Sequence, residues 1–174
     1  MGKLIFGGLM MTTIALFVRL VVAEDTKREK YEYAYDKTSP SIQMYYNIKK
    51  YAELYDIPED YAFGLAYQET RYMGPLHEKY NHKQVSFAGA VGPMQVMPAT
   101  AAFINHKARV SRKKLTEDIE YNVETSMKLL RYLYDKYGDW PTVFGAYNTG
   151  RPLVNQYAMN IINKKYTWID DQQD

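Results

Sequence analysis

One carboxylate stands in an otherwise apolar helical stripe of this chain. Over residues 61–73 a single face of the predicted helix carries Ala62, Leu65, Ala66, Glu69 and Met73, at helical spacing. We therefore expect Glu69 to face inward, where burial raises the pKa of a carboxyl group and keeps it able to donate a proton near neutral pH. A general acid is one interpretation of Glu69. The alternative is a side chain at the end of the stripe that reaches solvent.

A second segment, residues 86–101, also carries polar side chains suited to chemistry. Its two glycines and Pro93 make a poor helix or strand and let the backbone approach a neighbour or a ligand closely. Ser86 and Gln95 add a hydroxyl and an amide that suit sugar hydroxyls or an acetamido group. A tight loop that crosses the core is the alternative interpretation.

Between these segments, residues 76–85 are polar and contain His77, Glu78 and His82. Zinc-binding HExxH motifs place two imidazoles four residues apart on one helix face. Here the histidines are five apart and follow a Gly-Pro break, so they would not share a face. We expect a solvated loop here, and neither a metal nor another cofactor.

Helices that begin near a proline and end near a glycine are expected to position these side chains. They are predicted from Ser39-Pro40 to near Tyr55, from Pro58 to the Gly74-Pro75 break, from Pro98 through Ile104, from a Thr116 cap to Gly138, from Asp139 or Trp140 through Tyr147, and from Pro152 through Ile161. Residues 106–114 form a basic, exposed stretch. Because period-two alternation is scarce, the pattern predicts an all-α, or nearly all-α, domain.

The two ends of the chain differ from the part between them. Residues 1–23 have a basic start and a long apolar run, which predicts an export signal peptide. Residues 4–22 are also long enough to anchor the chain in a membrane, so cleavage and anchoring both stay open. Residues 24–40 form a charged, Tyr-rich linker, with a short edge strand as the alternative. The domain is expected over 41–163, followed by a polar tail over 164–174.

Charge and cysteine content exclude several classes of function. Two of the 22 basic residues, Lys3 and Arg19, precede Ala23, and the remainder balances 20 basic against 20 acidic residues. Such a chain gives no support for nucleic-acid binding, which needs a concentrated basic face. The absence of cysteine excludes a disulfide framework, a thiolate metal site and a cysteine nucleophile.

Three motifs in order resemble the lytic transglycosylases of the soluble, goose-lysozyme-like type, over roughly residues 41–163. That family places a catalytic Glu, usually followed by Ser, at the end of a helix, where this chain has Glu69-Thr70. Its second motif, Ser-x-Ala-Gly-Ala-x-Gly-Leu-Met-Gln-x-Met-Pro-x-Thr-Ala, is matched by residues 86–101 with Pro93 in place of Leu. Its third, Ala-Tyr-Asn-x-Gly, is matched by residues 146–150.

The resemblance implies cleavage of the β-1,4 bond between N-acetylmuramic acid and N-acetylglucosamine in peptidoglycan. Glu69 would protonate the leaving oxygen, and the acetamido group of the substrate would stabilise the oxocarbenium-like centre. Glu69 would then act as the base toward the C6 hydroxyl of the same sugar. The product would carry a 1,6-anhydro ring, and no water would be consumed.

The resemblance also implies which residues bind the substrate. Ser86 and Gln95 would hold the acetamido group and the stem-bearing sugar, while Met94 would pack on a sugar face. Tyr147 and Asn148 would position the reacting ring close to the catalytic carboxyl, and Thr70 is expected among the substrate-binding residues as well.

Three departures from the family pattern bear on this expectation. Thr70 keeps the hydroxyl of the usual Ser and adds a methyl group, and Pro93 removes an N–H. Residues 76–85 look like an insertion that borders the cleft. Within it, Glu78 could serve as a second carboxylate that activates water, which would make the protein a hydrolytic muramidase. A peptidoglycan-binding module with a dead site is a further alternative.

The resemblance places the protein in the cell envelope, exported or anchored through residues 4–22. Its partner would be the glycan strands of the cell wall. A tethered enzyme of this kind suits a secretion or conjugation apparatus, a phage particle or ordinary wall remodelling, and these settings stay open.

Overall fold

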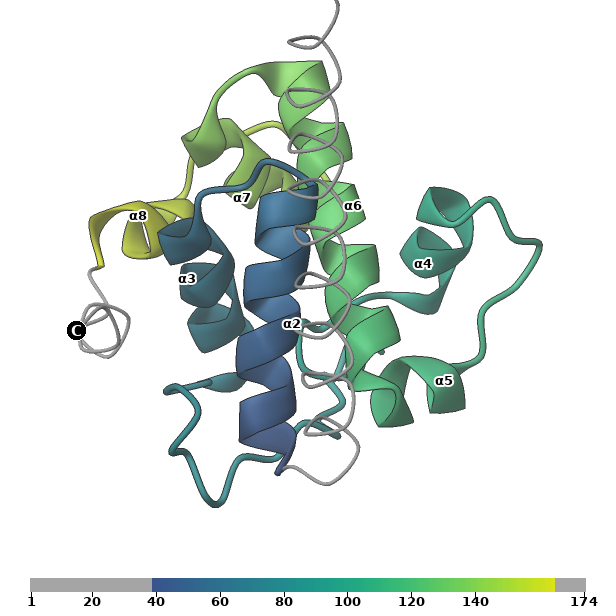
Figure 1. Cartoon of the computed structure of the whole chain (residues 1–174). Helices are drawn as coiled ribbons and strands as arrows, with labels where there is room; N and C mark the ends of the chain where they lie inside the picture. Colours follow the sequence, from purple (N-terminus) through teal and green to yellow (C-terminus); the bar gives the residue numbers. More distant parts are fainter. Residues whose placement is uncertain (1–38, 165–174) are drawn as a thin grey trace, which may run out of the picture. The chain divides into compact units, whose positions relative to one another are not determined.

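The computed structural model describes residues 39–164 (Figure 1). The predicted export segment, the linker up to residue 38 and the tail from residue 165 lie outside the described residues. The described part is built from α2 (Pro40–Leu54), α3 (Glu59–Thr70), α4 (Pro98–Ile104), α5 (Arg112–Glu117), α6 (Ile119–Tyr137), α7 (Trp140–Thr149) and α8 (Gln156–Asn163).

Within residues 39–164 the β structure is limited to two isolated antiparallel bridges, which join Val91 to Val85 and to Val96. The prediction of an all-α domain is therefore confirmed for this part of the chain. None of its helices is long and apolar enough to cross a membrane.

The long helix α6 is the element on which most of the others pack. It contacts α2, α4, α5 and α7, while α3 packs between α2 and α8. In Figure 1, α2 runs beside α6, and α4 and α5 lie on the side of α6 away from α3 and α8. The helix that carries Glu69 is therefore held by its neighbours α2 and α8.

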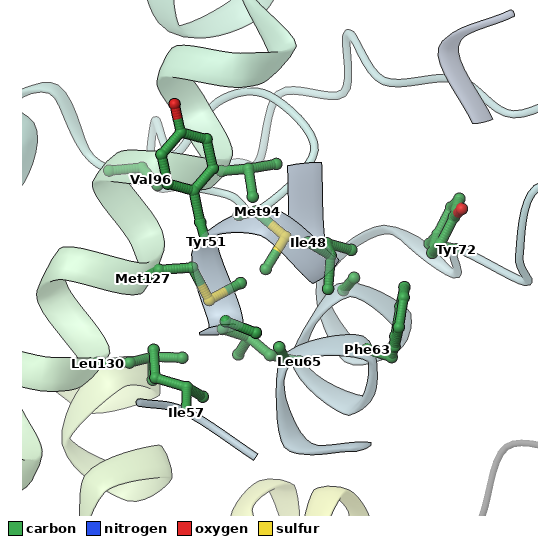
Figure 2. Packing of buried hydrophobic residues seen from close by; sticks show 14 of the residues in the cluster. Ile48, Tyr51, Ile57, Phe63, Leu65, Tyr72, Met94, Val96, Met127 and Leu130 are labelled. Atoms are coloured by element: carbon green, nitrogen blue, oxygen red, sulfur yellow. The ribbon is translucent and has the colours of Figure 1, made fainter. Parts of the chain in front are cut away.

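The hydrophobic core lies between these helices and the loop that precedes α4. Figure 2 shows side chains from α2, α3, α6 and this loop, and the fully buried ones include Ile48, Leu65, Met94, Met127 and Leu130. Full burial of one such side chain contributes about 1.5–3 kcal/mol relative to exposure. The stripe predicted on α3 is part of this core, because Ala62, Leu65 and Ala66 have no exposed surface.

Several predicted helix ends are confirmed by their capping residues. The prolines at the starts of α2, α4 and α7 stand in the first turn, where a missing N–H costs nothing. Asp139 caps α7 through a 3.0 Å bond from the N–H of Thr142. Gly138 and Gly150 end α6 and α7 in the left-handed conformation that glycine adopts without strain.

The predicted end of the Glu69 helix is wrong by about one turn. The helix ends at Thr70 because Arg71 adopts a left-handed conformation, with φ of 59°. The chain then turns so that Tyr72 is buried and donates a 2.7 Å hydrogen bond to the carbonyl of Ser41. Met73, expected on the inward stripe, is instead 54% exposed.

Two predicted helix starts are also wrong. Thr116 lies inside α5, where its hydroxyl donates to the carbonyl of Arg112, and Asp118 caps α6 instead. The basic stretch 106–114 therefore contains the beginning of α5, which starts after the Ser111 cap. The last helix does not start at Pro152, because Asn155 accepts from the N–H of Ala158 and so caps α8.

Candidate active site

Glu69 is the penultimate residue of α3 and is half-buried, with its carboxyl group directed inward toward α8, as its place in the stripe predicts. Burial raises the pKa of its carboxyl group to about 7, and a hydrogen bond from the Tyr157 hydroxyl partly offsets that rise. The bond reaches Oε1 of Glu69. Near neutral pH the carboxyl group therefore populates both its protonated and its charged form.

The two oxygens of this carboxyl group differ in their surroundings. Among the described residues, Tyr157 alone bonds to the Glu69 carboxyl, and it does so at Oε1. The buried polar side-chain atoms that lack a partner in this part of the chain are His77 Nδ1 and Tyr121 Oη, so Oε2 of Glu69 is not sealed inside the protein. One oxygen is thus held while the other is left to exchange a proton.

Two tyrosines from successive helices surround Glu69. Tyr157 comes from α8 and Tyr147 from α7. Burial raises the pKa of both hydroxyls, and the negative charge of Glu69 raises both further. Both tyrosines are therefore neutral hydrogen-bonding groups close to the carboxyl group.

The Tyr147 hydroxyl also joins separate parts of the domain. It donates to the carbonyl of Met94 at 2.7 Å and lies 2.9 Å from the hydroxyl of Ser126 on α6. Because its one proton is directed to Met94, Ser126 is the donor in the second bond. Tyr147 thus joins α7 and α6 to residues 86–97, the glycine-rich loop that precedes α4.

The position of Tyr157 depends on a close approach between α7 and the chain that leads into α8. A Cβ at Gly145 would overlap the carbonyl oxygen of Leu153, so only glycine fits at this contact. Asn155 then caps α8, and its amide also donates to Oδ1 of Asn148 at 3.2 Å. These contacts bring α8 against α3 with Tyr157 turned toward Glu69.

The glycine-rich loop is anchored to α6 by a fully buried side chain, Asn122. Its amide donates to the carbonyls of Val91 and Leu115, and its Oδ1 accepts from the N–H of Met94 at 2.9 Å. The amide of Gln95 donates within the loop, to the carbonyls of Gln84 and Gly92. The loop is therefore a fixed wall beside the carboxyl group rather than a loose connection.

Ser86 and Asn148, both predicted to bind substrate, retain exposed surface. Ser86 is half-buried at the start of a turn, and its hydroxyl accepts from the N–H of Ala90 at 3.0 Å. Phe87, at the tip of the same turn, is fully exposed. Asn148 is exposed at the end of α7.

Met94 and Thr70 lie elsewhere than the resemblance implied. Met94 has no exposed surface and packs in the core, so its side chain offers no face to a sugar (Figure 2). Thr70 is 3% exposed, and its hydroxyl bonds to the carbonyl of Pro93 and to the hydroxyl of Tyr80. Both residues lie in the packed contact between the loop and α3, so they stabilise the site without facing the substrate.

The segment 76–85 is not the solvated loop that the sequence predicts throughout its length, because Tyr80 is buried and bonds to Thr70 at the end of α3. Glu78 is exposed, and among the described contacts none joins it to Glu69, Tyr147 or Tyr157. In this described part no three His, Cys, Asp or Glu side chains are grouped so as to hold a metal ion.

Sequence reasoning missed Tyr157, Tyr80 and Asn122. Tyr157 lies inside the last predicted helix, from Pro152 through Ile161, where no role is expected for it, although a buried tyrosine hydroxyl usually needs a partner. Glu69 was the inward-facing polar residue for which the sequence predicted no hydrogen-bond partner. The need of both side chains for a partner was therefore the signal that could have predicted this pair. For Tyr80 and Asn122 we find no comparable signal, because single polar residues in a loop or a helix do not predict which distant carbonyls they bind.

The fold and the site together define a helical, lysozyme-like domain with a partly buried acidic side chain at the end of a helix. Residues 46–167 match the family described as Transglycosylase SLT domain. The chain belongs to this family.

Relatives and solved structures agree with this assignment. The chain is 29% identical over 133 residues to the soluble lytic murein transglycosylase of Escherichia coli strain K12. The aligned part covers 72% of this chain and 19% of that relative. The crystal structure of the 70 kDa soluble lytic transglycosylase SLT70 from Escherichia coli is 30% identical, with a TM-score of 0.52, over 67% of this chain and 18% of that one. The chain spans about a fifth of the length of these relatives.

A more distant structure shows the same fold. It is an inactive mutant of the lytic transglycosylase Slt from Pseudomonas aeruginosa, 21% identical, with a TM-score of 0.50 over 60% of this chain and 16% of that one.

Proposed function

We propose that this domain is a peptidoglycan lytic transglycosylase that cleaves the β-1,4 bond between N-acetylmuramic acid and N-acetylglucosamine. The observation that carries the proposal is Glu69, whose buried carboxyl group has a pKa of about 7 at the position of the family's catalytic Glu. The family membership and the names of the relatives support the same activity.

In the first half of the reaction, protonated Glu69 donates its proton from Oε2 to the glycosidic oxygen. The bond from that oxygen to C1 of the muramyl sugar breaks, and the N-acetylglucosamine side leaves with a new hydroxyl. Tyr157 stabilises the resulting carboxylate by its bond to Oε1. The acetamido group of the substrate stabilises the positive charge that develops at C1.

In the second half, the carboxylate accepts the proton of the C6 hydroxyl while O6 bonds to C1. The product is a 1,6-anhydro-muramyl end, and Glu69 is again protonated for the next turnover. A pKa near the working pH suits both steps, because the same group must be an acid and then a base.

This mechanism requires one carboxylate, whereas most glycosidases use two. The described neighbours of the Glu69 carboxyl are the tyrosines Tyr147 and Tyr157. Glu78, the candidate for a second carboxylate, is exposed, and no described contact joins it to Glu69. The arrangement therefore favours the transglycosylase over a hydrolytic muramidase, and a proton-donating Glu69 favours an enzyme over a binding module.

Substrate contacts are proposed for the residues that the family motifs place around Glu69 and that are not packed in the core. Ser86 and Asn148 are assigned to the sugar hydroxyls, and Tyr147 to the placement of the reacting ring. The amide nitrogen of Gln95 is used by the loop, which leaves its oxygen to accept the N–H of an acetamido group.

The proposed substrate also sets a location. Peptidoglycan lies in the cell envelope, so residues 1–23 are proposed to export the chain or, through residues 4–22, to anchor it. An anchored enzyme would open the wall locally, as a secretion or conjugation apparatus, a virion or wall growth requires.

Replacing Glu69 by Gln tests this proposal. The amide keeps the size of the side chain and cannot donate or accept the catalytic proton, so release of fragments from dye-labelled peptidoglycan should fall by at least about 100-fold. Circular dichroism should show an unchanged helical fold. Appreciable residual release by Glu69→Gln would exclude Glu69 as the acid and base.

A further inference from the structure

The hydroxyl of Thr70, directly after Glu69, is the centre of a buried hydrogen-bond cluster. Thr70 is 3% exposed. Its Oγ1 lies 2.7 Å from the carbonyl oxygen of Pro93, 2.7 Å from the hydroxyl of Tyr80 and 3.3 Å from the carbonyl oxygen of Ala66. The carbonyl of Thr70 also accepts a bond, at 3.1 Å, from the amide of Gln84.

The proton positions in this cluster follow from its distances. A threonine hydroxyl has one proton, and the carbonyl of Pro93 is the nearer of its two carbonyl acceptors. The two hydroxyl oxygens of Tyr80 and Thr70 lie 2.7 Å apart. Because Thr70 donates its proton to Pro93, Tyr80 must be the donor in this bond. The bonds run in one direction, from Tyr80 through Thr70 to Pro93.

Three members of this cluster lie where the chain departs from the family motifs. Thr70 replaces the usual Ser, Pro93 replaces the usual Leu, and Tyr80 lies in the inserted segment 76–85. In the folded domain the three meet at one hydroxyl group. The insertion thus reaches the end of α3, one residue from Glu69.

Tyr80 is held firmly enough to act as a support. It is 7% exposed and packs edge-on against Tyr72, with ring centroids 5.1 Å apart. The ring of His77 lies tilted against it, at 5.4 Å between centroids. The last turn of a helix has no intrahelical partners for its final carbonyls and frays easily. Bonds from Tyr80 and Gln84 to the last residue of α3 restrain this turn, which also carries Glu69.

We propose that Tyr80 is a positioning residue for Glu69: acting through Thr70 and the carbonyl of Pro93, it fixes the end of α3 against the glycine-rich loop. The catalytic part of this proposal rests on the proposed function. The restraint on Glu69 does not, because it is a property of the folded chain.

The direct test is Tyr80→Phe, which removes the donor hydroxyl and keeps the ring. Misplacement of a reacting group lowers the chemical step more than binding, so kcat should fall by about tenfold and KM should change by less than about twofold. Tyr72→Phe is the matched control. It removes a neighbouring buried hydroxyl that donates a 2.7 Å hydrogen bond to the carbonyl of Ser41. This control should lose stability while kcat stays unchanged.

A double-mutant cycle separates positioning from a general loss of stability. Thr70→Ser keeps the cluster and should retain kcat, whereas Thr70→Val removes it. Tyr80→Phe combined with Thr70→Val should be no slower than Thr70→Val alone, because the two changes break one chain of bonds. Independent, multiplying effects would contradict the proposal.

A measurement that needs no activity completes the test. The Glu69 carboxyl is titrated by NMR of carbon-13-labelled glutamate in the wild type, Tyr80→Phe and Tyr72→Phe, with Tyr147 and Tyr157 as its titratable neighbours. We expect the Glu69 pKa to fall in Tyr80→Phe, since water reaches a loosened helix end, and to stay unchanged in Tyr72→Phe. If the wild type released no peptidoglycan, the proposed function would fail while this titration still decided the role of Tyr80. An unchanged Glu69 pKa in Tyr80→Phe would overturn that role.

Discussion

Two opposing effects set the protonation state of Glu69. Burial raises the pKa of its carboxyl group, and the bond from Tyr157 lowers it, with a net value of about 7. Burial is the larger effect, so the group is far from the ordinary value of 4.5. Glu69 is thus a weak acid whose Oε1 is fixed by the hydroxyl of Tyr157, and its pKa depends on that hydrogen bond.

Removing the Tyr157 hydroxyl should change both the rate and its pH dependence. In Tyr157→Phe the bond that lowers the Glu69 pKa is lost, so this pKa should rise further above 7. The fall in rate as Glu69 loses its proton should therefore move to higher pH. The maximal rate should drop by roughly 10-fold or more, because a hydrogen bond to the carboxylate is worth about 1.5–3 kcal/mol. A pH–rate profile of turnover measures both effects.

Tyr51→Phe is a suitable control for this variant. It also breaks a bond from a tyrosine hydroxyl to a carboxylate, the 2.8 Å contact with Glu120 between α2 and α6. It should leave the pH–rate profile unchanged. A shift toward lower pH in Tyr157→Phe, or an equal shift in both variants, would contradict the assigned role of Tyr157.

Among the elements, the junction between α7 and α8 decides where Tyr157 lies. The overlap that a Cβ at Gly145 would make with Leu153 must push the two segments apart. Alanine is otherwise favoured over glycine inside a helix by about 1 kcal/mol. A loss of stability in Gly145→Ala would therefore come from the overlap with Leu153 and not from helix propensity.

We expect Gly145→Ala to lower the free energy of unfolding by at least about 2 kcal/mol, as overpacking does, and to reduce turnover by moving Tyr157. Gly138→Ala is the comparison, because Gly138 has open space around it but a positive φ of 79°. It should cost about 1 kcal/mol from strain alone and leave turnover unchanged. Denaturant unfolding and kcat are measured for both. Full activity in Gly145→Ala would show that the junction does not place Tyr157.

The elements also show which parts of the fold can be predicted from the sequence. Prolines marked the starts of α2, α4 and α7 because their ring excludes most other positions in a helix. The end of α3 was missed because Arg71, not a glycine, adopts the left-handed conformation. Such a residue carries no local signal, since the burial of Tyr72 after it is a tertiary effect.

For the site, periodicity predicted the inward position of Glu69 but none of its partners. Tyr157 lies 88 positions away along the chain, and the bond is made only when α8 packs on α3. Met94 was misplaced for a related reason. A motif shows which residues accompany a site, but not which of them contact substrate and which pack behind it.

For the whole molecule, the raised pKa of Glu69 predicts how stability varies with pH. The folded state binds this proton more tightly than the unfolded chain, whose pKa is near the ordinary 4.5. The contribution of Glu69 to the free energy of unfolding is therefore fully present below pH 4.5 and is lost as pH rises through about 7. It amounts to about 3 kcal/mol at most, at 1.36 kcal/mol per pKa unit.

This dependence is measured as the difference between the wild type and Glu69→Gln in urea unfolding at several pH values. Other titrating groups are common to both proteins and cancel in that difference. The wild type should lose stability relative to Glu69→Gln as pH rises from about 4.5 to about 7. A pH-independent difference would mean that Glu69 is not held in its protonated form.

The most direct test of the account is mass spectrometry of the muropeptides that the purified protein releases from peptidoglycan in water enriched in oxygen-18. If Glu69 acts alone as acid and base, the products end in 1,6-anhydro-muramic acid and contain no heavy oxygen. Reducing ends that carry oxygen-18 would contradict the account, because they require an activated water and a second carboxylate such as Glu78.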